Sequence, residues 1–242
     1  MKKITDLQAI VLDYGGTLDT NGHHWAAILW EAYQSVGFPI TESQFREAYV
    51  FAERALAKAP IIKVDDDFFH LLLKKVENEI AWLEFRKQVR ISGLQQQNYI
   101  YQIANYCNDY VLRNLERTRP VLSTLQERFS LHLVSNFYGN ISTVLRTYNL
   151  SNHFASVTES ASVGVRKPDP AIFQLALGKI PAENPSEVLV VGDSFKKDIL
   201  PARSIGCKTV WLKGHGWTSD EECDSTIPDA IITDFQELLA LI

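Results

Sequence analysis

The chain has 242 residues and a mass of 27.4 kDa, with 46% hydrophobic and 22% charged residues, the proportions of an ordinary globular protein. Its formal net charge of −5 at pH 7 gives no reason to expect nucleic acid or an anionic membrane as a partner. Because no apolar run reaches the length of a membrane span and the three cysteines are far apart, we expect a soluble, cytoplasmic protein with free thiols.

The first part of the chain predicts one strand followed by a block of helices. A buried strand is expected at residues 9–12, and the glycine turn after Asp13 allows backbone groups to approach a ligand closely. Thr41 and Gln44 form a capping box, and Asp65 or Asp66 is the expected cap of the third helix. Helical spacing then predicts four helices, at 25–36, 41–59, about 66–90 and 95–116.

From residue 120 onward strands and helices alternate, which is typical of a parallel sheet covered by helices. Strands are expected at 131–134, 154–158, 188–191, 208–212 and 230–233, and helices at 120–129, 140–148, 170–177, 197–205 and 235–241. The first strand has to join the same sheet. We therefore expect a three-layer, Rossmann-like α/β core at 1–19 and 118–242, with an all-helical cap domain inserted at 20–117.

Polar residues suited to phosphate chemistry follow several of these strands. Asp13, Ser135 and Asp193 each stand at the carboxyl end of a predicted strand, and Lys167 and Asp198 lie in the segments between. Ligands of open α/β sheets bind at that edge of the sheet. A carboxylate nucleophile, a hydroxyl, a cation and a metal-binding carboxylate are the parts needed to transfer a phosphoryl group to an aspartate.

These segments resemble the four motifs of the haloacid dehalogenase superfamily of hydrolases, most of which are phosphatases. The matching runs are Asp13-Tyr14-Gly15-Gly16-Thr17-Leu18, Ser135-Asn136, Lys167-Pro168, and Gly192-Asp193-Ser194 continuing to Asp198. They occur in the family's order and span nearly the whole chain. The resemblance implies a Rossmann-like core with a helical cap and a small phosphorylated metabolite as substrate.

The resemblance also implies a role for each matching residue. Asp13 would attack phosphorus to form an aspartyl phosphate, with Ser135 and Lys167 stabilising the phosphoryl group. Mg²⁺ would be the cofactor. Its ligands would be Asp13, the carbonyl of Gly15 and Asp193, with Asp198 as an outer ligand or support, and the expected substrate-binding residues are Gly16, Thr17, Asn136, His23 and His24.

The chain departs from the family at Gly15, where phosphatases of the superfamily usually carry a second aspartate as general acid and base. General acid-base catalysis typically contributes about 10² to 10⁴ in rate, so we expect the slowest hydrolysis for substrates with poor leaving groups. Asp19, His23 and His24 lie just beyond the turn, and we expect that one of them supplies a substitute.

Three alternatives follow from the same motifs. The 2-haloacid dehalogenases act without metal and carry tyrosine at this position, which fits Gly15 and the acidic Asp193 poorly. Phosphonoacetaldehyde hydrolases carry alanine there and use a cap lysine as a Schiff base, and the run 59–65 around Lys63 faintly resembles their lysine segment. The third is a phosphate-binding or regulatory protein without turnover. The sequence does not predict the oligomeric state.

Overall fold

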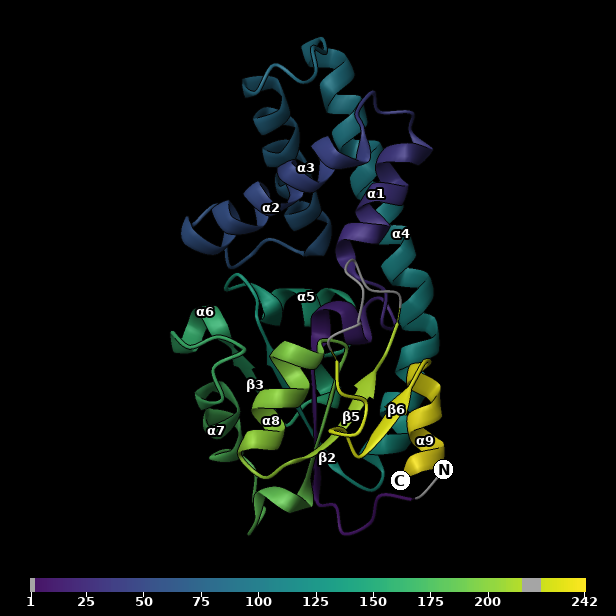
Figure 1. Ribbon diagram of the computed structural model, residues 1–242, viewed down its shortest axis with the longest axis vertical. Coiled ribbons are helices and arrows are strands. Elements are labelled where there is room, and N and C mark those ends of the chain that lie inside the picture. Colours follow the sequence, from purple (N-terminus) through teal and green to yellow (C-terminus); the bar gives the residue numbers. More distant parts are fainter. Residues whose placement is uncertain (1–2, 215–222) are drawn as a thin grey trace.

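A computed structural model describes residues 3–214 and 223–242 as a sheet with helices on both faces and a helical block beyond one edge of the sheet (Figure 1). The sheet has six parallel strands in the order β3-β2-β1-β4-β5-β6. The strands are β1 (Ala9–Leu12), β2 (Ser130–Ser135), β3 (Ser156–Glu159), β4 (Val188–Gly192), β5 (Lys208–Leu212) and β6 (Ala230–Ile232). The predicted α/β class and the six predicted strands are confirmed.

The sequence of β1 explains why both faces of the sheet are covered. Its four residues are all buried, as expected of a central strand in a parallel sheet. Because side chains alternate along a strand, Ile10 and Leu12 pack on one face and Ala9 and Val11 on the other. The first face packs under α4, α5 (Ile141–Thr147) and α9 (Leu238–Leu241), and the second under α7 (Ala171–Leu177) and α8 (Leu200–Ser204).

The helical block lies between β1 and β2 in the chain and consists of four helices, which we call the helical insert together with the turns that join them. They are α1 (Trp25–Ser35), α2 (Glu42–Lys58), α3 (Phe68–Phe85) and the N-terminal part of α4 (Gly93–Gln126). The predicted capping box at Thr41 and Gln44 is present. The third helix, however, is capped by Asp67, whose side chain accepts from the backbone N–H of His70, and not by Asp65 or Asp66.

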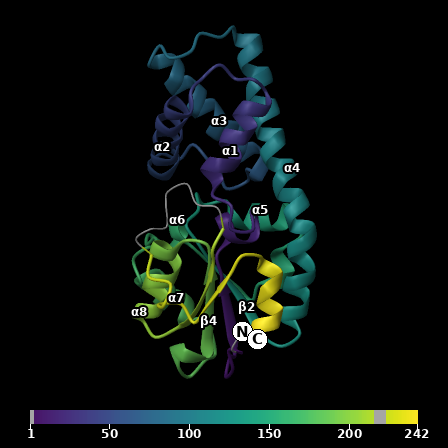
Figure 2. The same ribbon diagram turned by 45° about the vertical axis from the view of Figure 1, so that its right-hand side comes forward.

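The largest difference from the sequence prediction concerns α4. Two helices, 95–116 and 120–129, were expected because Pro120 lacks a backbone donor and usually begins or ends a helix. The structure has one helix of 34 residues with Pro120 inside it. At 1.5 Å per residue it is about 51 Å long. It runs from the helical insert down beside the sheet (Figure 2), where Val121, Leu122 and Leu125 are buried against the core.

This long helix also holds the segment that follows β1. Asn114 and Thr118 on α4 both donate hydrogen bonds to the carbonyl oxygen of Leu18, at 3.0 and 3.1 Å. Leu18 ends the irregular helical turn Tyr14–Leu18 directly after Asp13. The position of that turn therefore depends on the packing of α4 against the sheet. None of the helices that the structure describes is both long and apolar enough to cross a bilayer.

A buried acid lies at the centre of the helical insert. Glu79 of α3 is fully buried, and its Oε2 accepts a hydrogen bond of 2.9 Å from the hydroxyl of Tyr33 on α1. Burial raises the pKa of Glu79 from 4.5 to about 7, although Lys75 and the Tyr33 hydroxyl oppose the shift. Glu79 is therefore largely neutral below neutral pH and becomes a buried anion above it.

We expect the replacement Glu79→Gln to change how stability depends on pH. In the wild type Glu79 has a pKa of about 7 in the folded state and about 4.5 in the unfolded state. Between these values the folded state binds more protons than the unfolded state, so the free energy of unfolding falls as pH rises. Glutamine does not titrate. The stability of the variant relative to wild type should thus rise by about 1–3 kcal/mol between about pH 5 and pH 8. Urea unfolding at several pH values measures this.

Glu77→Gln is the matched control, because Glu77 lies on the same helix and is exposed. Its stability relative to wild type should stay nearly constant over the same pH range. If the difference in free energy of unfolding between Glu79→Gln and wild type did not change with pH, the raised pKa of Glu79 would be contradicted.

Candidate active site

Three of the predicted site residues meet at one edge of the sheet. Asp13 follows β1, Ser135 ends β2, and Asp193 follows β4. Strand β1 lies between β2 and β4, and all three run parallel, so their carboxyl ends are neighbours. The topology alone brings Asp13 together with two residues that follow it by more than a hundred positions in the chain.

Lys167 joins this group through two buried ion pairs. Its Nζ lies 2.7 Å from Oδ1 of Asp13 and 2.6 Å from Oδ1 of Asp198, and it also donates to the carbonyl of Val134 at 3.3 Å. The side chain is only 4% exposed. Burial alone would lower the pKa of Lys167, but the carboxylates of Asp13 and Asp198 raise it well above its ordinary value. The residue is therefore a fixed cation between two carboxylates.

Asn136 holds the backbone of Lys167 in place. Its side-chain Nδ2 donates to the Lys167 carbonyl at 2.9 Å, and its Oδ1 accepts from the Lys167 N–H at 2.8 Å. The amide thereby replaces a pair of backbone hydrogen bonds between two loops. Asn136 also lines the cavity described below.

Asp193 is held by Thr17, across the turn after β1. The Thr17 hydroxyl accepts from the backbone N–H of Asp193 at 3.0 Å and donates to its Oδ1 at 3.1 Å. Gly16 lies against the same carboxylate: a Cβ at this position would be 2.4 Å from Oδ2 of Asp193, and its φ is +97°. Only glycine satisfies both conditions, so the close approach of the two loops requires it.

The three aspartates form an unbalanced cluster of negative charge. Carboxylate oxygens of Asp13, Asp193 and Asp198 lie within 4.8 Å of one another. Burial, followed by the charges of Asp198 and Asp13, raises the pKa of Asp193 well above its ordinary value. Burial also raises the pKa of Asp198, although Lys167 opposes the shift. Three carboxylates face a single lysine, so a hard divalent cation would balance the excess negative charge. Carboxylate oxygens are ligands that Mg²⁺ prefers, so the donor set fits this ion.

A cavity of about 820 Å³ opens above this cluster, between the sheet edge and the helical insert. Nine of the eleven predicted site residues line it: Asp13, Gly15, Gly16, His24, Ser135, Asn136, Lys167, Asp193 and Asp198. Thr17 and His23 do not line it. Thr17 is instead bonded to Asp193, and the ring of His23 lies 6.2 Å from that of Tyr110. Substrate contact by these two residues remains a prediction.

The three candidates for the missing acid have different surroundings. Asp19 is fully buried, and its two oxygens accept from the Gly16 N–H at 2.7 Å and from the Trp25 indole N–H at 3.0 Å. Burial raises the pKa of Asp19 to about 7, although these two donors lower it. Asp19 does not line the cavity, and it supports the turn that carries Gly16.

His24 is the candidate that lines the cavity. Its Nδ1 accepts from the backbone N–H of Ala26 at 3.1 Å, which caps α1. Burial, together with the nearby Lys197 and Lys75, lowers the pKa of His24 to about 4. The ring is therefore neutral at pH 7 with its proton on Nε2, so it can donate a hydrogen bond but holds no additional proton to transfer.

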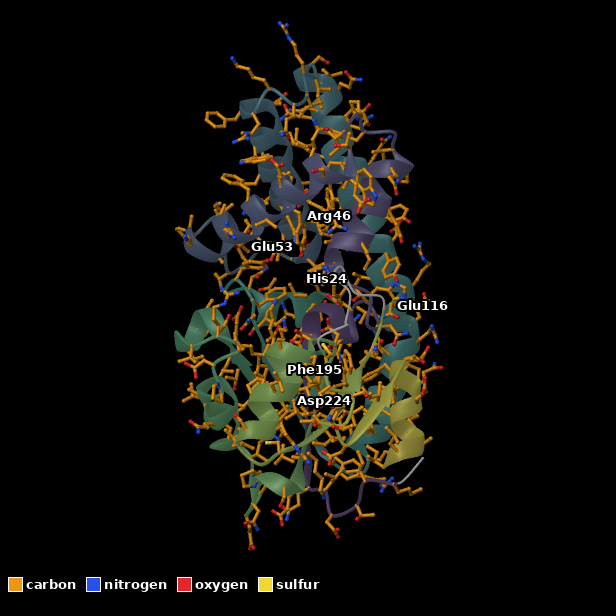
Figure 3. The ribbon with its side chains drawn as sticks, in the orientation of Figure 1. His24, Arg46, Glu53, Glu116, Phe195 and Asp224 are labelled. Carbon is orange, nitrogen blue, oxygen red and sulfur yellow. The ribbon has the colours of Figure 1, made fainter. Side chains whose placement is uncertain are left out.

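Several cavity residues from the helical insert were missed by the sequence analysis. Glu53 of α2 and Lys75 of α3 form an ion pair, and the hydroxyl of Tyr138, in the loop after β2, donates to Glu53. In Figure 3 Glu53 and His24 lie on the side of the insert that faces the sheet. The signal for Lys75 was present, because a charged residue occupies the apolar stripe of α3.

The chain is similar to known hydrolases in sequence and in fold. A family model for haloacid dehalogenase-like hydrolases matches residues 7–206. Haloacid dehalogenase-like hydrolase domain-containing protein 3 of Danio rerio is 41% identical over 110 residues, which are 43% of this chain and 43% of that protein. A phosphoglycolate phosphatase of Photorhabdus laumondii is 35% identical over 102 residues, 42% of each chain. The match thus spans less than half the length of these relatives.

A solved structure of a dehalogenase with an intermediate complex has a TM-score of 0.64 and 18% sequence identity, covering 99% of this chain and 98% of that chain. This likeness supports the fold. The family model covers most of the chain, and the chain belongs to the haloacid dehalogenase-like hydrolases.

Proposed function

We propose that this protein is an Mg²⁺-dependent hydrolase of small phosphorylated metabolites that acts through an aspartyl-phosphate intermediate. The observation that carries the proposal is Asp13, fixed by the buried Lys167 at the floor of a cavity beside two further carboxylates. Relatives that are named phosphatases, such as the phosphoglycolate phosphatase above, support phosphate esters as substrates over haloacids.

In the proposed reaction the free carboxylate oxygen of Asp13 attacks phosphorus, and the bond from phosphorus to the leaving oxygen breaks. The leaving oxygen departs as an anion and takes up a proton from solvent, and the water that attacks in the next step returns a proton to solvent. Water then attacks the aspartyl phosphate, which releases inorganic phosphate and restores the carboxylate. Lys167 keeps its charge throughout and offsets the negative charge of nucleophile and phosphoryl group, while Ser135 and the neighbouring backbone N–H hold phosphoryl oxygens.

We propose Asp13, the carbonyl of Gly15 and Asp193 as the ligands of Mg²⁺, with Asp198 in support. When bound, the ion would supply positive charge that polarises the phosphoryl group. We also propose residues 1–19 and 118–242 as the catalytic core and 20–117 as a cap that shields the cavity from water. Helix α4 crosses this boundary without a break.

The surroundings of His24 suggest how the protein works without an acid at position 15. We propose that Nε2–H of His24 donates a hydrogen bond into the cavity, which assists the leaving oxygen without transferring a proton. A hydrogen bond helps less than proton transfer, so esters of acidic alcohols and phenols should be better substrates than alkyl phosphates.

The replacement Asp13→Asn tests the nucleophile. Asparagine keeps the size of the side chain but does not attack phosphorus, so we expect the release of phosphate from p-nitrophenyl phosphate to fall by more than about 10³-fold. Wild-type activity should disappear with a chelator and return with Mg²⁺. Release of halide from 2-haloacids without metal would contradict the proposal, as would undiminished turnover by the variant.

The replacement Gly15→Asp should add the missing acid. A Cβ at Gly15 meets no atom within 4 Å, and its backbone, at φ −76° and ψ 113°, accepts any residue. We expect turnover of alkyl phosphates to rise by about 10²-fold or more, with a smaller gain for p-nitrophenyl phosphate, whose leaving group needs no proton. Steady-state kinetics on both esters measure the difference.

Gly16→Ala is the matched control for this gain. Its Cβ would collide with Asp193, and its positive φ disfavours alanine, so we expect activity to be lost on both esters. Equal effects of Gly15→Asp on good and poor leaving groups would argue against the role assigned to position 15.

A further inference from the structure

A cluster of polar side chains lies across the cavity from Asp13. It consists of Tyr49 and Glu53 on α2, Lys75 on α3 and Tyr138 in the loop after β2, and we call it the roof cluster. All four residues line the cavity. Tyr138 comes from the sheet side and the other three from the helical insert, so the cluster spans the two parts of the molecule.

Glu53 is the centre of the roof cluster. Its Oε1 accepts from Lys75 Nζ, and the Tyr138 hydroxyl lies 3.2 Å from both of its oxygens. The Nζ of Lys75 also lies 4.6 Å from the centre of the Tyr49 ring. Burial would raise the pKa of Glu53, but Lys75 and Tyr138 lower it, so the residue is a carboxylate at neutral pH.

The carboxylate of Glu53 still has acceptor capacity on the cavity side. Its side chain is 35% exposed, whereas that of Lys75 is 6% exposed, and Glu53 lines the cavity. A carboxylate offers about four acceptor positions. Among the residues that the structure describes, Oε2 receives only the shared Tyr138 hydroxyl, so a ligand hydroxyl can add a hydrogen bond there.

The balance of charge in the roof cluster selects among leaving groups. Glu53 and Lys75 neutralise each other, so the roof cluster offers no net charge to a carboxylate or an ammonium group of the ligand. Besides Lys167, the other cationic residues that line the cavity, Lys58, Arg166, Lys196 and Lys197, lie outside this cluster. Neutral hydroxyls suit both residues, because a hydroxyl donates to a carboxylate and accepts from an ammonium. The aromatic rings of Trp25, Phe137 and Tyr138 also line the cavity and offer apolar surface to the C–H groups of such a ligand.

We propose that the roof cluster is the specificity site for a polyhydroxy leaving group, with Glu53 as its principal acceptor. The preferred substrate is then a phosphorylated sugar or sugar alcohol, in place of a phosphorylated carboxylic or amino acid. A cavity of about 820 Å³ has room for such a molecule. This inference rests on the proposed phosphatase function and adds the substrate class.

The test compares kcat/KM for a hexose 6-phosphate, phosphoglycolate and p-nitrophenyl phosphate in the wild type and in Glu53→Gln. The wild type should prefer the hexose phosphate to phosphoglycolate. The variant should lose about 10- to 100-fold on the hexose phosphate, because a neutral amide replaces the charged acceptor of the hydrogen bond, and less than about 3-fold on p-nitrophenyl phosphate. Glu47→Gln, an exposed residue on the same helix, should leave all three unchanged.

A second variant guards against misfolding, because Glu53→Gln leaves Lys75 buried without its ion pair. The double replacement Glu53→Gln with Lys75→Met removes both charges together, and it should show the same selective loss with a wild-type thermal transition. An equal loss on all three substrates would overturn the inference, as would a wild-type preference for phosphoglycolate.

Substrate binding can be measured on the inactive variant Asp13→Asn, so the role of the roof cluster can be tested separately from the proposed hydrolysis. Calorimetry with hexose 6-phosphate on Asp13→Asn, with and without Glu53→Gln, measures the roof cluster even if no substrate turns over. We expect Glu53→Gln to weaken binding of the sugar phosphate and to leave binding of inorganic phosphate unchanged. If sugar phosphate binds equally well to both proteins, the roof cluster is not its specificity site.

Discussion

The arrangement of the active site depends on the ammonium group of Lys167, which is buried between Asp13 and Asp198. Burying an isolated carboxylate costs several kcal/mol, so three aspartates do not gather at one sheet edge without compensation. Lys167 compensates two of them, and the N–H of Ser194 adds a hydrogen bond to Asp198. Asp193 has the weakest compensation among the described residues: it is influenced by the charge of Lys167 without an ion pair to it, and it accepts one side-chain hydrogen bond, from Thr17. The remaining negative charge explains why the site suits a cation.

The sheet and its carboxyl-end residues could be predicted because they depend on local signals. Short apolar runs define the strands, and the rule that parallel strands end at one edge brings Asp13, Ser135 and Asp193 together. The ends of helices were harder to predict than the strands. Pro120 predicted a break in α4, but the buried side chains on both sides of it pack on one continuous core, and this tertiary packing outweighs the local preference. The roof cluster could not be predicted, because Glu53 and Tyr138 meet only after the insert has folded over the sheet.

The turn after β1 shows how closely packing and chemistry are linked. Gly16 is required because its backbone touches the carboxylate of Asp193, whereas Gly15, one residue earlier, has open space where a side chain would be. Asp19 is one of the three predicted substitutes for the missing acid, and in the structure its two oxygens accept hydrogen bonds from Gly16 and Trp25. Its contribution is structural, since it fixes the N–H of the residue that packs on Asp193.

The unbroken course of α4 has a mechanical consequence. The helical insert is joined to the sheet by α4 on one side and by the short non-helical link 19–24 on the other. Any rocking of the insert must therefore be absorbed by that link or by flexing of α4. The same stretch of α4 carries Asn114 and Thr118, which grip the carbonyl of Leu18. A movement of the insert that opens the cavity to a ligand would therefore also displace the turn beside Asp13, because α4 is attached to both.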